Sequence, residues 1–161
     1  MIKMLKKIKN PIVVFLIFLL ALLIPKVKGK KKPVDWTEIQ KLLKGVFGEK
    51  CVLFLVDGKY RIPTLESFQK FLKEDKTDLY KYVPEEMDCD DFSFRLMGQA
   101  SYPGWSDIAF GIAVSQTHAY NCIIAEDSGQ NRVFLVEPQN DRVFLVPKSP
   151  KAAYKTTFVM M

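Results

Sequence analysis

The chain has 161 residues, 48% of them apolar, which is enough for one domain with a hydrophobic core. Its formal net charge of +6 is matched by the six lysines of residues 1–29, where no acidic residue occurs, so residues 30–161 are formally neutral. A nucleic-acid-binding surface needs basic residues clustered on the folded part, so this composition argues against that class of protein.

An uninterrupted apolar run extends from Ile12 to Ile24, between Pro11 and Pro25. As a helix it would span about 20 Å, short of the ~30 Å hydrocarbon core of a bilayer, which is typical of a signal peptide or a short signal-anchor. A small residue at Gly29 permits cleavage there, whereas the flanking lysines disfavour it. We therefore expect one N-terminal hydrophobic helix and a membrane-anchored or exported protein.

The domain boundaries follow from this segment. Residues 1–29 are the expected signal peptide or membrane anchor, residues 30–34 a charged linker, and residues 35–161 the folded domain. Capping residues and apolar periodicity predict helices over about 36–47, 65–73 and 88–100.

Strands are predicted between and after these helices. Residues 51–56 and 59–62 read as a hairpin around Asp57-Gly58, and five further strands are expected at 108–114, 118–125, 132–136, 142–146 and 156–160. The pentapeptide Arg-Val-Phe-Leu-Val occurs at 132 and again at 142, which predicts the two arms of one hairpin. The fold class is α+β, with the helices packed on one face of an antiparallel sheet.

Cys89 lies within the acidic sequence Met87-Asp88-Cys89-Asp90-Asp91-Phe92. If Asp88 caps the third helix, Cys89 occupies its first position, where free N–H groups and the helix dipole favour a thiolate and could hold an oxyanion. Three neighbouring carboxylates raise a thiol pKa, so a purely structural Cys89 is an equal alternative.

His118 is the sole histidine, so it is the natural general base for a cysteine nucleophile. Glu137 ends a later strand and could orient the imidazole, and Asn121 and Asn140 are rival orienting residues. The sequence therefore predicts Cys89, His118 and Glu137 as a catalytic group, in the chain order of papain-like hydrolases.

The same acidic cluster could instead bind a metal ion. Asp88, Asp90 and Asp91 supply oxygen ligands suited to calcium, although their spacing does not match an EF-hand loop. Cys51 and Cys122 lie in buried-strand patterns, and if two of the three cysteines form a disulfide we expect these two.

Several of these segments together resemble the C-terminal domain of mushroom agglutinins and its bacterial and viral relatives. The resemblance covers about residues 51–146 and is carried by Asp88-Cys89-Asp90-Asp91-Phe92, His118-Ala119-Tyr120-Asn121 and Glu137-Pro138-Gln139. It implies a papain-like fold, a Cys89–His118–Glu137 triad, calcium at the aspartates beside Cys89, and proteolytic activity. The sugar-binding β-trefoil that precedes this domain in agglutinins is absent, so carbohydrate binding is not expected.

The expected function is thus a membrane-directed or exported cysteine hydrolase acting on a peptide or protein substrate. One alternative is a catalytically silent, calcium-stabilised binding module on a membrane tether. Another is an amidase or transglutaminase with the same triad. The sequence does not indicate the substrate or the oligomeric state.

Overall fold

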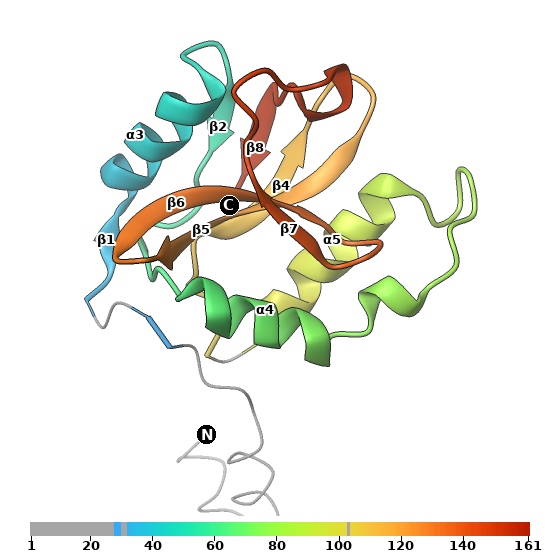
Figure 1. Cartoon of the computed structure of the whole chain (residues 1–161), viewed down its shortest axis with the longest axis horizontal. Coiled ribbons are helices and arrows are strands. Elements are labelled where there is room, and N and C mark those ends of the chain that lie inside the picture. Colours follow the sequence, from blue (N-terminus) through green and yellow to red (C-terminus); the bar gives the residue numbers. More distant parts are fainter. Residues whose placement is uncertain (1–27, 30–31, 103) are drawn as a thin grey trace, which may run out of the picture.

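The computed structural model describes residues 28–29, 32–102 and 104–161, which form a mixed α+β domain (Figure 1). In chain order the elements are β1 (Val34–Asp35), α3 (Trp36–Phe47), β2 (Val52–Phe54), β3 (Lys59–Tyr60), α4 (Leu65–Glu74), a 3-10 turn (Thr77–Leu79), α5 (Cys89–Ala100), β4 (Phe110–Val114), β5 (Ala119–Asp127), β6 (Gln130–Glu137), β7 (Arg142–Leu145), a second 3-10 turn (Ala152–Tyr154) and β8 (Phe158–Met160). The α+β class predicted from the sequence is confirmed.

The helices begin where capping side chains allow. The Asp35 carboxylate accepts a hydrogen bond from Thr37 N at 3.1 Å and starts α3. The Thr64 hydroxyl accepts one from Ser67 N at 3.2 Å and starts α4. These bonds satisfy N–H groups that the first turn of a helix leaves unpaired, which is why local sequence predicts both boundaries well.

The main sheet has six strands in the order β2-β8-β4-β5-β6-β7. Its β6 and β7 strands pair antiparallel with Val136 opposite Val143, so the repeated pentapeptide does form one hairpin. The expected hairpin of residues 51–56 with 59–62 is wrong, because β2 pairs in parallel with β8 and β3 pairs with β1. The sheet is therefore mixed, and not antiparallel throughout.

Helices cover both faces of this sheet, which corrects the expectation of helices on one face. One hydrophobic cluster joins Ile39 and Leu43 of α3 to Tyr120, Cys122 and Ile124 of β5. A second cluster joins α4 and α5 to the alternate β5 residues, and its members include Phe68, Leu96, Ile123 and Ala125. Since successive strand residues point to opposite faces, β5 is buried on both sides and forms the centre of the domain.

The start of the described chain contacts the domain at α4. The carbonyl of Lys28 accepts hydrogen bonds from Thr64 N at 2.7 Å and from Ser67 Oγ at 3.0 Å. Gly29 forms an isolated bridge with Pro63, whose Cα would lie 2.6 Å from a Cβ at position 29. Lys28 and Gly29, the last residues of the expected N-terminal segment, are therefore hydrogen-bonded beside the first turn of α4.

No helix in the described part of the chain is long and apolar enough to cross a membrane. The transmembrane helix expected from the sequence is accordingly not found there. The apolar run at 12–24 on which that expectation depended lies outside the described residues.

Candidate functional site

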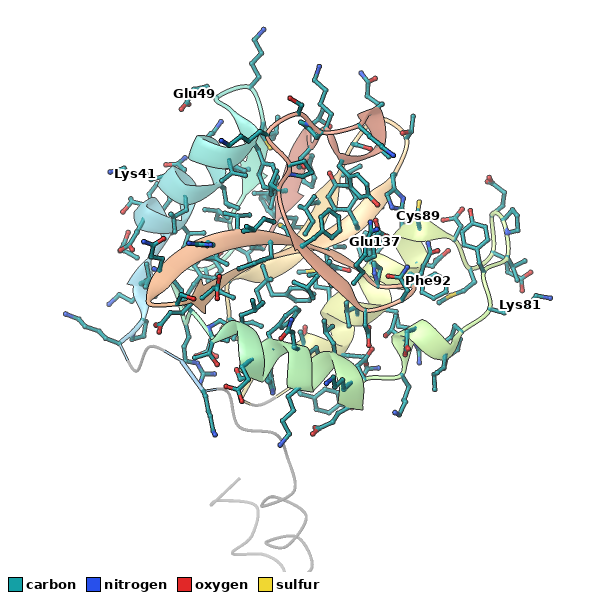
Figure 2. All side chains as sticks on the ribbon, in the orientation of Figure 1. Lys41, Glu49, Lys81, Cys89, Phe92 and Glu137 are labelled. Atoms are coloured by element: carbon teal, nitrogen blue, oxygen red, sulfur yellow. The ribbon has the colours of Figure 1, made fainter. Side chains whose placement is uncertain are left out.

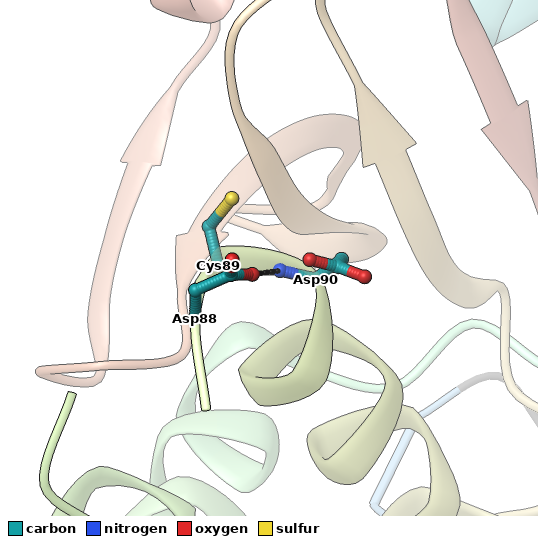
Figure 3. Close-up of side chains that lie close together, drawn as sticks. All are labelled: Asp88, Cys89 and Asp90. Atoms are coloured by element: carbon teal, nitrogen blue, oxygen red, sulfur yellow. Dashed lines mark hydrogen bonds between the residues drawn. The ribbon is translucent and has the colours of Figure 1, made fainter. Parts of the chain in front are cut away.

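Cys89 is the first residue of α5, as its sequence context predicts. The Asp88 side chain accepts a hydrogen bond from Asp90 N, and Asp91 Oδ2 accepts one from Asp88 N at 3.1 Å, which together form a capping box. The carbonyl of Cys89 accepts a hydrogen bond from Ser93 Oγ at 2.7 Å. The half-buried thiol is thus fixed at a rigid helix N-terminus (Figure 3).

His118 and Glu137 are brought together from two neighbouring parts of the sheet. His118 precedes β5 and Glu137 ends β6, and His118 Nε2 lies 3.1 Å and 3.3 Å from the two carboxylate oxygens of Glu137. An ionised carboxylate only accepts hydrogen bonds, so the ring hydrogen of His118 lies on Nε2, and Nε2–H donates the hydrogen bond to Glu137. The predicted pairing of these two side chains is present.

The rival orienting residues have other partners. Asn121 is fully buried, and its Nδ2 donates to the carbonyls of Ser93 at 2.9 Å and Gly111 at 3.2 Å. Asn140 Oδ1 accepts a hydrogen bond from Arg142 N within the β6–β7 turn. Of the three candidates, Glu137 is the one that contacts His118.

The polar network continues beyond Glu137 to residues that the sequence analysis missed. The Tyr154 hydroxyl group donates a hydrogen bond to Glu137 Oε1 at 2.6 Å and accepts one from the Arg142 guanidinium group at 3.1 Å. Arg142 also lies 4.5 Å above the centre of the Phe144 ring, which packs edge-on against Tyr154. Tyr154 lies in a segment without helical or strand periodicity, so no local pattern could have identified it.

Glu137 is ionised within this network. Burial of its carboxyl group by itself raises the pKa, but the hydrogen bonds from His118 and Tyr154 and the nearby charge of Arg142 outweigh burial. The pKa of Glu137 is therefore held below its ordinary value. The buried charge is fully engaged with groups of the protein.

Among the described residues, the Cys89 thiol makes no hydrogen bond with this network. Figure 2 shows Cys89 at the start of α5 and Glu137 in the same region of the molecule. Within the described residues, however, Cys89 Sγ has no hydrogen-bonding atom of His118 within 4.0 Å in suitable geometry. The Nε2 atom of His118 is hydrogen-bonded to Glu137 instead. The structure thus forms the His118–Glu137 pair but does not connect Cys89 to it.

Two of the three predicted metal-binding aspartates lie together. Ligand atoms of Asp88, Cys89 and Asp90 are within 4.8 Å of one another (Figure 3), whereas the Asp91 carboxylate is occupied by the capping box. The hydrogen bond to the Asp88 carboxyl group raises the pKa of Asp90. Calcium needs about six to eight oxygen ligands, so two carboxylates and a soft thiol do not fit it by themselves, and calcium binding stays a prediction.

Cys51 and Cys122 are both buried and both free. Burial raises the pKa of each thiol, so each behaves as a small apolar side chain of the core beneath α3. The disulfide considered for this pair is absent from the structure.

A surface pocket of about 410 Å³ adjoins the polar network. Its lining residues come from β7 and the segment that follows it: Arg142, Phe144, Pro147, Ser149, Lys151 and Tyr154. The pocket therefore presents two aromatic rings and two cationic side chains to solvent, and Tyr154 connects it to the buried Glu137.

The α+β fold is similar to that of two solved structures. The chain is similar in structure to PSL1a in its complex with E64, with a TM-score of 0.65 and 20% identity over 80% of this chain and 50% of that one. It is also similar to the Polyporus squamosus lectin bound to the human-type influenza-binding epitope Neu5Aca2-6Galb1-4GlcNAc, with a TM-score of 0.63 and 20% identity over 80% of this chain and 49% of that one. The chain thus spans about half the length of these solved structures. No family model and no curated protein matches the sequence.

These similarities are consistent with the resemblance to agglutinins and correct the expected function. The cysteine hydrolase predicted from the sequence is corrected by this comparison, because the similar solved structures include a lectin. The expected protease activity is corrected with it, whereas the expected transmembrane helix lies outside the described residues.

Proposed function

We propose that this chain is a non-catalytic binding module whose ligand is a carbohydrate, bound in the pocket beside β7. The proposal depends on one observation: a pocket lined by two aromatic rings and two cations, on a fold shared with a lectin that binds a saccharide. It departs from the sequence-based expectation that carbohydrate binding would not extend to this domain.

The lining of the pocket has the chemistry that a sugar requires. A saccharide ring presents an apolar face of C–H groups, which stacks on aromatic side chains such as Phe144 and Tyr154. Its hydroxyl groups need donors and acceptors at fixed positions, and the hydrogen-bond chain from Arg142 through Tyr154 to Glu137 holds such groups in place. The geometry therefore favours a bound polyol over a purely apolar ligand.

The charge of the pocket favours an acidic saccharide. Arg142 and Lys151 both line it. The charge of Arg142 helps to lower the pKa of the buried Glu137, whereas Lys151 has no ion pair among the described residues. A sugar carboxylate next to these side chains gains charge-assisted hydrogen bonds. We infer that sialylated or otherwise acidic glycans bind more tightly than neutral ones.

Titration calorimetry with a sialylated trisaccharide and its desialylated counterpart tests the proposal. We expect Phe144→Ala to weaken binding of the acidic sugar at least tenfold and Lys151→Ala to reduce the preference for it over the neutral one. Leu145→Ala is the matched control, because Leu145 follows Phe144 on β7 but does not line the pocket. Equal affinities of the Phe144 variant and the control would contradict the proposal.

A second arm separates binding from catalysis. Because Cys89 takes no part in the pocket, Cys89→Ser should bind the acidic sugar with unchanged affinity. The saccharide should also be recovered unaltered after prolonged incubation with the protein. Loss of affinity in the Cys89 variant would show that the ligand site lies at the helix N-terminus instead.

A further inference from the structure

Strand β2 lies at one end of the main sheet and exposes an apolar stripe. It pairs with β8 on one side, and no other strand of the described residues pairs with its outer edge (Figure 1). Val52, Phe54 and Val56 are 59%, 55% and 59% exposed, whereas Leu53 and Leu55 between them pack against the core under α3. An apolar edge strand of this kind is a template for pairing with another strand.

The backbone groups on the outer edge belong to the two leucines. Hydrogen bonds to the β8 side run from Val52 N to Thr157 O at 2.9 Å, from Met161 N to Phe54 O at 3.0 Å and from Val56 N to Met161 O at 2.8 Å. Since successive residues of a strand direct their N–H and C=O groups to opposite sides, Leu53 and Leu55 direct theirs away from β8. Each of these two residues offers one donor and one acceptor at the open edge.

The segment made of β2 and the two residues after it has the same sequence in both directions: Val52-Leu53-Phe54-Leu55-Val56. An antiparallel strand of identical sequence, centred on Phe54, places Leu53 opposite the second copy's Leu55 and Phe54 opposite the second copy's Phe54. The leucine pairs are then the hydrogen-bonded ones, which is the pattern that their outward N–H and C=O groups require. The exposed valine and phenylalanine side chains of both copies fall on one face, where each covers the other.

Charged side chains of both signs flank the palindromic segment. Glu49 and Lys50 precede it, Asp57 and Lys59 follow it, and all four are exposed. An antiparallel second copy brings the residues before the segment near those after it, so each end of the contact combines two side chains of each sign. We propose that two copies of this chain associate through antiparallel pairing of β2 about a two-fold axis at Phe54, which joins their sheets into one.

Site-directed cross-linking of the full chain in a mild detergent tests this register. On the two-fold axis, position 54 faces itself at a Cα separation of about 4.5 Å, which lies within the disulfide range of roughly 4.4–6.8 Å. In a Cys89→Ser background, Phe54→Cys should therefore form a covalent dimer on mild oxidation. Val52→Cys should not, because residue 52 faces residue 56, and a mixture of Val52→Cys and Val56→Cys should cross-link again.

Charge variants provide a second readout that does not depend on oxidation. Phe54→Lys and Phe54→Glu place like charges on the axis, so each should sediment as a monomer, while their equimolar mixture should recover the dimer. Phe94→Lys is the matched control, since Phe94 is 56% exposed, close to the 55% of Phe54, but belongs to α5 and not to β2. The proposal is wrong if Val52→Cys cross-links as fast as Phe54→Cys, if no cysteine variant cross-links, or if mixing the charge variants leaves only monomers.

Discussion

Asp141, in the turn between β6 and β7, is a partly buried carboxyl group whose charged neighbours are Asp78, Asp75 and Lys76. Its Oδ1 is buried and has no hydrogen bond, and its backbone φ is 55°. Burial, followed by the charges of Asp78 and Asp75, raises its pKa from 3.8 to about 6. The folded state therefore binds this proton more tightly than the unfolded state, and the resulting stabilisation is complete below about pH 3.8 and lost as the pH rises through about 6.

Asp141→Asn should accordingly stabilise the protein at neutral pH. Asparagine keeps the shape of the side chain, tolerates a positive φ and carries no charge. A shift of about two pKa units corresponds to roughly 3 kcal/mol, and partial exposure to solvent reduces the expected gain to on the order of 1 kcal/mol. Urea unfolding should show this gain at neutral pH and its disappearance in acid, with Asp57→Asn as an exposed control. A variant less stable than the wild type at neutral pH would contradict the charge argument.

Glu137 has the opposite dependence on pH. Its pKa is lowered, so its contribution to stability is present above its ordinary value of 4.5 and is lost as the pH falls through the folded-state pKa. Glu137→Gln leaves His118 and Tyr154 with a weaker acceptor and should reduce stability by about 1–3 kcal/mol at neutral pH. Thermal melts at neutral and acidic pH test this, because the difference from wild type should narrow in acid. The Glu126 carboxylate makes no hydrogen bond or ion pair within the described residues. Glu126→Gln should therefore show no pH-dependent difference in stability from wild type.

At the level of single elements, the first turn of α5 depends on its capping box. Asp88→Ala removes the acceptor for Asp90 N and should lower stability by about 0.5–2 kcal/mol. Asp90→Ala is the internal control: it removes a neighbouring carboxylate that accepts no capping bond, so its effect should be smaller. Chemical denaturation of the two variants distinguishes capping from general removal of charge. Equal losses would show that the helix dipole, and not the cap, stabilises this turn.

The elements also show what local sequence can predict here. Asp35, Thr64 and Asp88 cap their helices as expected, because capping bonds join residues two or three positions apart. The partner of β2 could not be predicted, since β8 lies about a hundred residues further along the chain and no local pattern encodes parallel pairing over that distance. The same reasoning explains the site, where His118 and Glu137 were identified as lone polar groups but Tyr154 was not.

The whole molecule is a sheet with a different feature at each end. The β7 end has the polar pocket, and the β2 end has the exposed palindromic strand. The proposed dimer through β2 carries its two pockets at opposite ends of one continuous sheet. Two sites on one assembly can hold a multivalent glycan surface more tightly than either site alone, which links the dimer to the proposed function.

The sheet is one unit only because β8 fits between β2 and β4. Gly111 on β4 is buried and lies against this strand, and a Cβ at position 111 would clash with the Met160 carbonyl oxygen and approach Met161 Cγ to 2.8 Å. The contact atoms include backbone, which cannot move aside without separating β4 from β8. Gly111→Ala should therefore destabilise the fold by about 3 kcal/mol, the upper end of the cost typical of overpacked cores.

The same glycine-to-alanine substitution at another position should stabilise the protein, and this second variant serves as the control. Gly45 lies in α3 with no atom within 4 Å of a Cβ at that position, so Gly45→Ala adds a better helix former at no steric cost. It should raise stability by about 0.5–1 kcal/mol. Urea titrations of both variants compare the two sites directly. A Gly111→Ala variant as stable as wild type would show that β8 can shift, and that the sheet tolerates a gap between the β2 edge and the strands that carry the pocket.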